Sequence, residues 1–272
     1  MSEVKRETSR TGVELATREW LPAGPPKAAI LIIHGLAEHS GRYEHVAAQF
    51  VDRGYAVHAY DQRGHGESGG DRTHVDDWQV FLDDVEDRLS AVAFEAKLPT
   101  VMYGHSIGGL VALDYCLTRS EVLPELLVLS GPAIKATIAK WKQVLAPILA
   151  KVLPNARLPL DLEGHQLSRD AAVGEAYFSD PLVETKATAK FGAEALEAQQ
   201  RVGERMAMLA IPTLVIAGGN DEIIPPQSSH SLGELAVVDR KLYPSLRHEL
   251  HNEPEGPEVV KDIADWLDSK LG

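Results

Sequence analysis

The stretch VMYGHSIGGL, residues 101–110, places a serine among three glycines, between two apolar segments. Val101 to Tyr103 have the character of a buried strand, and apolar residues resume after Gly109 with the pattern of a helix. A G-x-S-x-G motif at such a junction holds its serine in a strained turn, with the hydroxyl exposed. The glycines are needed because side chains would obstruct the turn. We therefore take Ser106 as a candidate nucleophile; a turn that merely contains a serine is the alternative.

The segments around this stretch alternate between apolar runs and amphipathic helices. AAILIIHG, residues 28–35, is a continuous apolar run that ends at glycine, as expected of a buried parallel strand. The same reasoning predicts further strands within 55–70, 125–132, 212–221 and 239–246, and helices within 42–54, 78–92, 107–118 and 259–267. The segment 12–22 fits an antiparallel edge strand. This order predicts an α/β fold with a mainly parallel central sheet and helices on both faces.

One segment interrupts the alternation. About 65 residues separate the strand that ends near Ser130 from the helix before Ile211, which is too long for a simple connection. The segment has its own apolar stripe, formed by Ile134, Ile138, Trp141, Leu145, Ile148 and Val152. Pro147 is expected to kink this helix. We therefore predict an α/β core of residues 1–132 and 195–272 with an inserted helical cap, residues 133–194.

Composition limits the partners and the compartment. The chain has 272 residues, 44% of them hydrophobic, and a net charge of −13, which argues against nucleic acid as a partner. Its single cysteine, Cys116, permits no internal disulfide and fits a reducing compartment. The first residues are polar, unlike a signal peptide, and no apolar run approaches the roughly 20 residues that span a membrane. We expect a cytoplasmic protein.

No motif for a metal or cofactor is recognisable. The loop DQRGHGESGG, residues 61–70, is rich in glycine but lacks the G-K-[ST] ending of a phosphate-binding loop. The histidines form no H-E-x-x-H pattern, and the glycines after the candidate strand at 99–106 do not form a dinucleotide fingerprint. We therefore expect neither a metal nor a cofactor.

A serine nucleophile needs a base and an acid that orients the base. Asp221 follows the predicted strand in 212–221, which brings it to the same edge of the sheet as Ser106. His248 is the first histidine after the last predicted strand, and the order serine, acid, histidine is that of α/β-hydrolases. We predict Asp221 as the acid and His248 as the base. The alternative interpretation of Asp221 is a solvated turn residue. His251, the second histidine after the last predicted strand, is instead a candidate pocket residue.

An acyl-transfer site also needs donors for the oxyanion. The backbone N–H of Ile107, directly after the candidate nucleophile, is one predicted donor. The turn after the strand 28–35 supplies the other, because His34-Gly35 permits a tight turn that directs the N–H of Leu36 toward Ser106. A plain glycine turn before a helix is the alternative interpretation.

Several motifs together resemble one family. HGLAEHSGRYEHVAAQF, YDQRGHGESGG, GHSIGG, DPLV, GGNDEIIPP and YPSLRHELHNEPE are similar to the monoacylglycerol lipases of the α/β-hydrolase superfamily, bacterial branch. The resemblance covers nearly the whole chain. It implies the α/β-hydrolase fold, with Ser106, Asp221 and His248 as catalytic triad and Leu36 and Ile107 as oxyanion donors.

The resemblance also implies a polar lining at the glycerol end of the site. Glu38 and Arg42 on the first loop and His251, three residues after the base, occupy the family's positions. A structural ion pair plus a loop histidine is the alternative. The implied activity is hydrolysis of monoacylglycerols to fatty acid and glycerol. A lysophospholipase or general carboxylesterase on the same scaffold stays open, as does a non-catalytic lipid-binding protein. An epoxide or haloalkane hydrolase would need a carboxylate where Ser106 stands.

The cap sequence has an unusual charge. Residues 133–153 contain four lysines and no acid, a net charge of +4 in a chain of −13. The lysines are Lys135, Lys140, Lys142 and Lys151. A basic, apolar helix on an acidic protein suits transient contact with a membrane or micelle surface. An ordinary helix pair with solvated lysines is the alternative.

Overall fold

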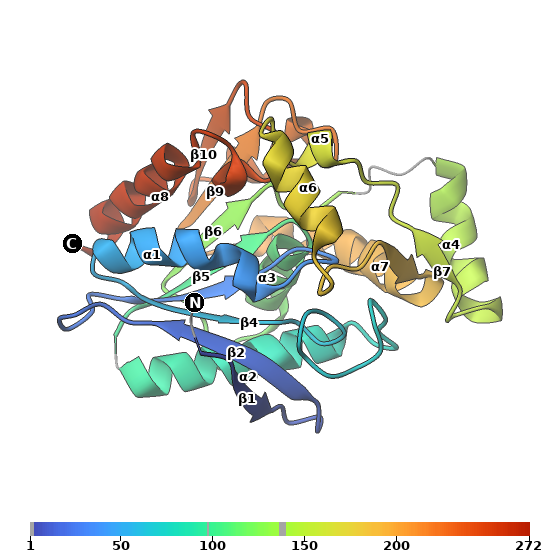
Figure 1. Ribbon diagram of the computed structural model, residues 1–272, viewed down its shortest axis with the longest axis horizontal. Coiled ribbons are helices and arrows are strands. Elements are labelled where there is room, and N and C mark those ends of the chain that lie inside the picture. Colours follow the sequence, from blue (N-terminus) through green and yellow to red (C-terminus); the bar gives the residue numbers. More distant parts are fainter. Residues whose placement is uncertain (1–2, 97, 136–139) are drawn as a thin grey trace.

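A central sheet organises the computed structural model, which describes residues 3–96, 98–135 and 140–272 (Figure 1). The sheet has eight strands in the order β1-β2-β4-β3-β5-β6-β9-β10. Their bounds are β1 Lys5–Thr8, β2 Glu14–Trp20, β3 Ala29–Ile33, β4 Ala56–Tyr60, β5 Thr100–His105, β6 Leu126–Ser130, β9 Thr213–Gly218 and β10 Val238–Tyr243.

Six neighbouring strands run parallel to one another, namely β4, β3, β5, β6, β9 and β10. By contrast, β1 pairs antiparallel with β2, and β2 pairs antiparallel with β4. The carboxyl ends of β3, β5, β6, β9 and β10 therefore lie at one edge. The expected antiparallel strand within 12–22 is β2, but the outer edge belongs to β1. The sequence KRET of β1 is entirely polar, so apolar patterning did not reveal it.

Helices cover both faces of the sheet. Their bounds are α1 Glu44–Asp52, α2 Gln79–Ala96, α3 Ile107–Thr118, α7 Ala189–Arg205 and α8 Gly256–Leu271; the 3-10 turns are Ser40–Tyr43, Met206–Met208, Pro226–Ser229, Leu232–Glu234 and Leu250–Asn252. Alternate residues of β3 point to opposite faces of the sheet and pack against different helices. Ile30 and Ile32 pack with α1 and α8, and Leu31 and Ile33 pack with α2, α3 and α7. The continuous apolar run of β3 follows from this burial on both faces.

The insertion between β6 and β9 lies over the carboxyl edge of the sheet (Figure 1). It contains α4 Lys140–Val152, β7 Arg157–Pro159, α5 Gly164–Leu167, α6 Ala171–Ser179 and β8 Lys186–Thr188, followed by α7. The predicted cap end at residue 194 lies inside α7, which packs against both α4 and α3. The separation of cap and core at that residue stays a prediction.

The apolar stripe of the insertion is largely exposed. Ile134 is buried, but Leu145, Ile148 and Val152 on α4 are 49%, 56% and 70% exposed. Ile138 lies outside the described residues, as does the side chain of Trp141. Pro147 lies within α4, as predicted. The stripe therefore packs only in part onto the protein.

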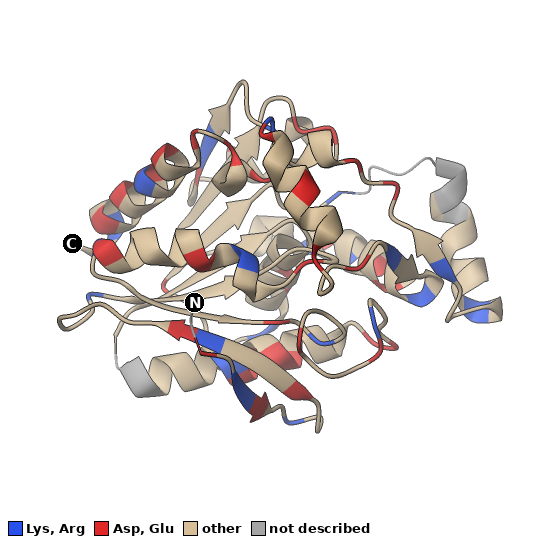
Figure 2. Cartoon of the chain, in the orientation of Figure 1, with Lys and Arg blue, Asp and Glu red and all other residues tan. Residues whose placement is uncertain are grey.

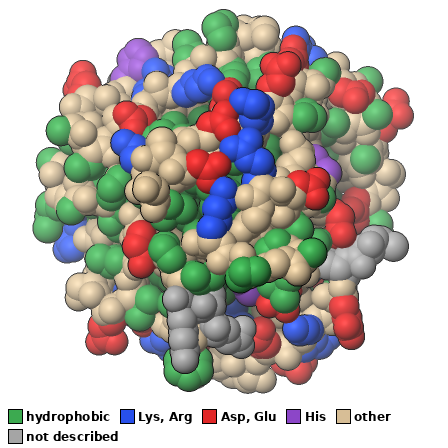
Figure 3. All heavy atoms as spheres, turned by 90° about the vertical axis from the view of Figure 1, so that its left-hand side faces the viewer, with side chains coloured by type: hydrophobic (Ala, Val, Ile, Leu, Met, Phe, Trp, Pro, Cys, Tyr) green, Lys and Arg blue, Asp and Glu red, His purple; other side chains and the backbone are tan. Residues whose placement is uncertain are grey.

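Charged side chains are distributed unevenly between α4 and the remaining surface. Acidic and basic residues are interspersed over most elements (Figure 2), including the face turned away from α4 (Figure 3). Ion pairs such as Lys27–Asp268 and Arg53–Asp265 join neighbouring charges on α8 and the adjoining loops. By contrast, the sequence of α4 contains lysines and no acidic residue.

Candidate active site

Ser106 stands in a sharp turn between β5 and α3. Its backbone has φ 52° and ψ −118°, a conformation that non-glycine residues rarely adopt. A Cβ on Gly104 would lie 2.6 Å from the carbonyl oxygen of Gly108, and a Cβ on Gly108 would lie 2.1 Å from that of Ile33. Both glycines are therefore required by close backbone approach. The turn places the Ser106 hydroxyl at the carboxyl edge of the sheet.

A chain of hydrogen bonds joins Ser106, His248 and Asp221. His248 Nε2 is 2.9 Å from Ser106 Oγ, and His248 Nδ1 is 2.7 Å from Asp221 Oδ2. The other carboxylate oxygen of Asp221 accepts the backbone N–H groups of Ile223 and Ile224 at 2.9 and 2.8 Å. With Nδ1–H donated to the carboxylate, Nε2 is left as the acceptor for the serine proton.

Burial and charge act in opposite directions on His248. Burial lowers the pKa of the imidazole, the Asp221 carboxylate raises it, and the net shift is upward from the ordinary value. The neighbouring ring of His105, with its centroid 4.8 Å away, is different. Burial, together with the His248 ring, lowers the pKa of His105 to about 4, so His105 is neutral at pH 7. The two neighbouring histidines are therefore shifted in opposite directions, and His248 alone of this pair has a raised pKa.

The two predicted oxyanion donors border the same cavity as Ser106. Ile107 is the first residue of α3, where backbone N–H groups have no acceptor within the helix. The loop of Leu36 passes close to the serine, because a Cβ on Gly35 would lie 3.3 Å from Ser106 Cβ. The side chain of Glu38 holds this loop by accepting the Gly35 N–H at 2.6 Å. The predicted donors are thereby brought to the nucleophile.

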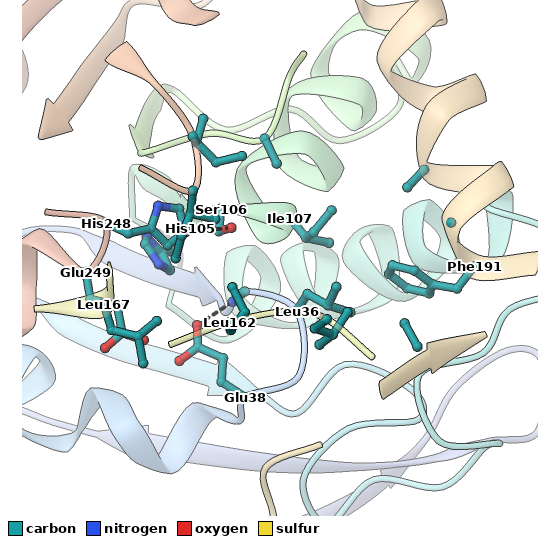
Figure 4. A pocket seen from close by; sticks show the side chains of 18 of the residues that line it. Leu36, Glu38, His105, Ser106, Ile107, Leu162, Leu167, Phe191, His248 and Glu249 are labelled. Carbon is teal, nitrogen blue, oxygen red and sulfur yellow. Dashed lines mark hydrogen bonds between the residues drawn. The ribbon is translucent and has the colours of Figure 1, made fainter. Parts of the chain in front are cut away.

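The cavity in front of Ser106 has a volume of about 270 Å³ and is lined mainly by apolar side chains. In Figure 4, Phe191 lies on the far side of Leu36 and Ile107 from Ser106. The remaining apolar lining comes from both core and insertion, and includes Leu160, Leu162, Leu167, Tyr177, Leu196, Ile223 and Ile224. Polar groups are confined to a few positions, an arrangement typical of a pocket for an apolar chain with a polar end.

The three residues expected at the glycerol end lie in different settings. Glu38 lines the cavity, and Arg42 Nη1 donates to its carboxylate at 2.7 Å. His251 is 1% exposed and stacks on the Tyr43 ring at 4.8 Å, and it is not among the residues that line the cavity. In the described part of the chain, neither nitrogen of its ring has a hydrogen-bond partner. Burial, together with the His105 ring, lowers the pKa of His251 well below its ordinary value.

Glu249 was missed by the sequence analysis. It lines the cavity beside Glu38, and its two carboxylate oxygens accept Arg42 Nη1 and Nη2, each at 2.7 Å. Burial alone would raise the pKa of Glu249, but the Arg42 guanidinium, together with His105 and Asn252, outweighs burial and lowers that pKa to about 2. Its position directly after His248 in RHELHNE was the available signal.

The described residues offer neither a metal-binding cluster nor a membrane-spanning helix. In residues 3–96, 98–135 and 140–272, no group of three or more histidine, cysteine, aspartate or glutamate side chains is arranged to hold a metal ion. No helix of these ranges combines the length and hydrophobicity needed to cross a membrane.

Comparison with known proteins gives similarity over most of the chain. The family described as serine aminopeptidase, S33, matches residues 24–255. A monoacylglycerol lipase of Mycolicibacterium smegmatis is 36% identical, over 96% of this chain and 95% of the relative. A monoglyceride lipase of Homo sapiens is also 36% identical, over 93% and 84%. The crystal structure of a monoacylglycerol lipase from Paleococcus ferrophilus has a TM-score of 0.83 and 27% identity, covering 94% of this chain and 99% of that one.

Proposed function

The chain belongs to the serine aminopeptidase S33 family of α/β-hydrolases, and from this we propose that it hydrolyses the ester bond of monoacylglycerols. The products are a free fatty acid and glycerol, released through an acyl-enzyme. One observation carries the assignment to this site: the hydrogen-bonded chain of Ser106, His248 and Asp221 opens into a mainly apolar cavity. The cavity suits an acyl chain, and the polar groups beside the serine suit a small head group.

In the proposed reaction, Ser106 Oγ attacks the ester carbonyl carbon while His248 Nε2 accepts the hydroxyl proton. Asp221 stabilises the imidazolium, and the N–H groups of Leu36 and Ile107 stabilise the oxyanion. Collapse of the tetrahedral intermediate breaks the bond to glycerol, and His248 returns the proton to the glycerol oxygen. Water then attacks the acyl-serine with His248 as base, which releases the fatty acid and regenerates the free serine.

Labelling with a fluorophosphonate tests the nucleophile directly. We expect one covalent adduct on the wild type and none on Ser106→Ala, whose kcat should fall by roughly 10⁴-fold or more. Hydrolysis of monoacylglycerols of varied chain length then tests the substrate class. Absence of an adduct on the wild type, or equal labelling of Ser106→Ala, rejects a serine hydrolase.

A lysophospholipase or a general carboxylesterase is the main rival. Two carboxylates, Glu38 and Glu249, line the cavity near Ser106, with the single guanidinium of Arg42 between them. This end of the site carries one excess negative charge, which disfavours a phosphate-bearing head group and accepts a neutral polyol. A panel of monoacylglycerols, lysophospholipids and short nitrophenyl esters separates these activities, and faster turnover of lysophospholipids would reject our choice.

We also propose that α4 contacts a membrane or micelle surface transiently. Leu145, Ile148, Val152 and Leu153 are exposed on or just after this helix, and the lysines of residues 133–153 give it positive charge. Such a surface suits an interface that presents a lipid ester. Replacing Lys135, Lys140, Lys142 and Lys151 by glutamine should weaken co-sedimentation with anionic vesicles at low salt. Unchanged sedimentation of that variant would reject the contribution of the lysines.

A further inference from the structure

One buried guanidinium connects residues 34–43 after β3, which we call the oxyanion loop, with residues 244–255 after β10, which we call the histidine loop. Arg42 lies in the 3-10 turn Ser40–Tyr43 of the oxyanion loop, and its side chain is 11% exposed. Nη1 donates both to Glu38 Oε2 and to Glu249 Oε1, and Nη2 donates to Glu249 Oε2, each at 2.7 Å. Bidentate, charge-assisted bonds of this kind fix orientation as well as distance.

On one side, the connection reaches the oxyanion loop. The Oε1 atom of Glu38 accepts the backbone N–H of Gly35 at 2.6 Å and the hydroxyl of Tyr43 at 2.8 Å. Gly35 immediately precedes Leu36, the predicted donor. The carboxylate that Arg42 holds in place therefore anchors the residue directly before the predicted donor.

On the other side, the connection reaches the base. Glu249 follows His248 directly, so anchoring its side chain restrains the backbone that carries the imidazole. Asn252 Nδ2 donates to Glu249 Oε2 at 2.7 Å, and the Glu249 backbone N–H donates to the Leu167 carbonyl at 2.9 Å. Glu249 is thus held at both ends, although the reaction as proposed above gives it no proton to carry.

We propose that Arg42 and Glu249 are positioning residues that keep the oxyanion loop and the histidine loop in register. This inference rests on the proposed function, because register matters only if Leu36 and His248 act on the same carbonyl group. A displacement of one loop by about 1 Å would separate the donor from the base and slow the reaction by roughly 100-fold. The pair acts through its neighbours and does not touch the reacting atoms.

A pH profile provides a readout that a purely structural pair would not affect. The groups that face His248 are His105, His251, Asp221, Glu38 and Glu249, and Arg42 lies behind the two glutamates. The negative charges of Glu249 and Glu38 raise the pKa of His248, in addition to the larger effect of Asp221. Since the base must be neutral, removal of the Glu249 charge should move the acid limb of kcat/KM to lower pH.

The experiment compares Glu249→Gln and Glu249→Ala on a soluble nitrophenyl butyrate, with active sites titrated by fluorophosphonate. Glu249→Gln keeps the shape of the bridge and removes its charge, so we expect a shifted acid limb and a loss of kcat of about 3–10-fold. Glu249→Ala removes the bridge as well, so we expect a loss of kcat of about 100-fold with KM changed less than threefold.

A matched control separates positioning from stability. Asp84 is fully buried and accepts Arg63 bidentately at 2.6 and 2.7 Å, and neither residue lines the cavity in front of Ser106. Asp84→Asn should lower Tm but leave kcat per titrated site and the acid limb unchanged. The proposal is overturned if Glu249→Ala retains the wild-type kcat per titrated site, or if Asp84→Asn shifts the acid limb equally. Wild-type activity on monoacylglycerols is measured separately, so failure of the proposed function is recognised independently.

Discussion

The two halves of the insertion meet the core in different ways. We call residues 140–153, with helix α4, the outer half and residues 164–184, with α5 and α6, the anchored half. The carbonyl groups of Gln166 and Leu167 accept the backbone N–H groups of His248 and Glu249 at 3.4 and 2.9 Å. Further along, Asp180 Oδ2 lies 2.9 Å from His39 Nε2 on the oxyanion loop. The outer half instead packs on α7 and exposes apolar side chains.

This difference shows that the insertion is not a uniform lid. The anchored half shares hydrogen bonds with the oxyanion loop and the histidine loop, so it forms part of the scaffold that positions Leu36 and His248. The outer half exposes Leu145, Ile148 and Val152, and an exposed apolar patch is costly in water unless it meets a partner surface. Changes in the anchored half should therefore alter the chemical step, and changes in the outer half should alter only the encounter with lipid.

The largest effect is expected where α5 and α6 touch. A Cβ on Gly174 would lie 2.6 Å from the Gly164 Cα atom, so Gly174→Ala must push the two helices apart. We expect kcat on a soluble ester to fall by roughly 100-fold, because α5 carries the carbonyl groups that hold the histidine loop. Gly203→Ala on α7 is the control, since nothing lies within 4 Å of its added Cβ. Wild-type kcat in Gly174→Ala would contradict the scaffold role.

The pH dependence of kcat/KM should further distinguish the outer half of the insertion from the anchored half. Burial lowers the pKa of His248, but Asp221, Glu249 and Glu38 together raise it more, so the base becomes protonated at a pH above the ordinary value of 6.5. We expect kcat/KM to fall about tenfold per pH unit below a midpoint that exceeds 6.5. Variants of the outer half should leave this limb in place. A wild-type midpoint below 6.5 would show that burial dominates.

A smaller, substrate-dependent effect is expected on the outer half. Replacing Leu145 and Ile148, which are 49% and 56% exposed, by asparagine removes apolar surface without opening the core. We expect activity on emulsified long-chain monoacylglycerols to fall several-fold, and activity on soluble nitrophenyl butyrate to stay within a factor of two. Equal losses on both substrates would mean that α4 supports the cavity itself.

The smallest effect on kcat is expected at Tyr177, whose ring lies over the Arg42 guanidinium. The Tyr177 ring of α6 lies 4.8 Å from the Arg42 guanidinium carbon, a cation–π contact worth about 1 kcal/mol. Tyr177→Leu should therefore reduce kcat by about 3–5-fold, whereas Tyr177→Phe keeps an aromatic face and should retain activity. If the Tyr177→Phe and Tyr177→Leu variants lose the same activity, the hydroxyl group of Tyr177 and not its ring is required for full kcat.

Local chemistry explains why most of the fold was predictable. The apolar run of β3, the glycines around Ser106 and the α/β alternation depend on neighbours in sequence, so pattern reasoning reached them. Apolar patterning did not predict β1, because its polar sequence is held by pairing with β2 and not by burial. The resemblance placed His251 at the glycerol end, which stays a prediction; its ring stacks on Tyr43 and is not part of the cavity lining.

By itself, the sequence determined the order of strands and helices, the strained serine turn, and the chain positions of the candidate acid and base. These features follow from apolar periodicity and from backbone conformations that only particular residues tolerate. Only the tertiary structure decided that Arg42 lies between Glu38 and Glu249, residues separated by more than 200 positions. It also decided which half of the insertion is anchored, because hydrogen bonds between distant segments depend on packing and leave no periodic signal in the sequence.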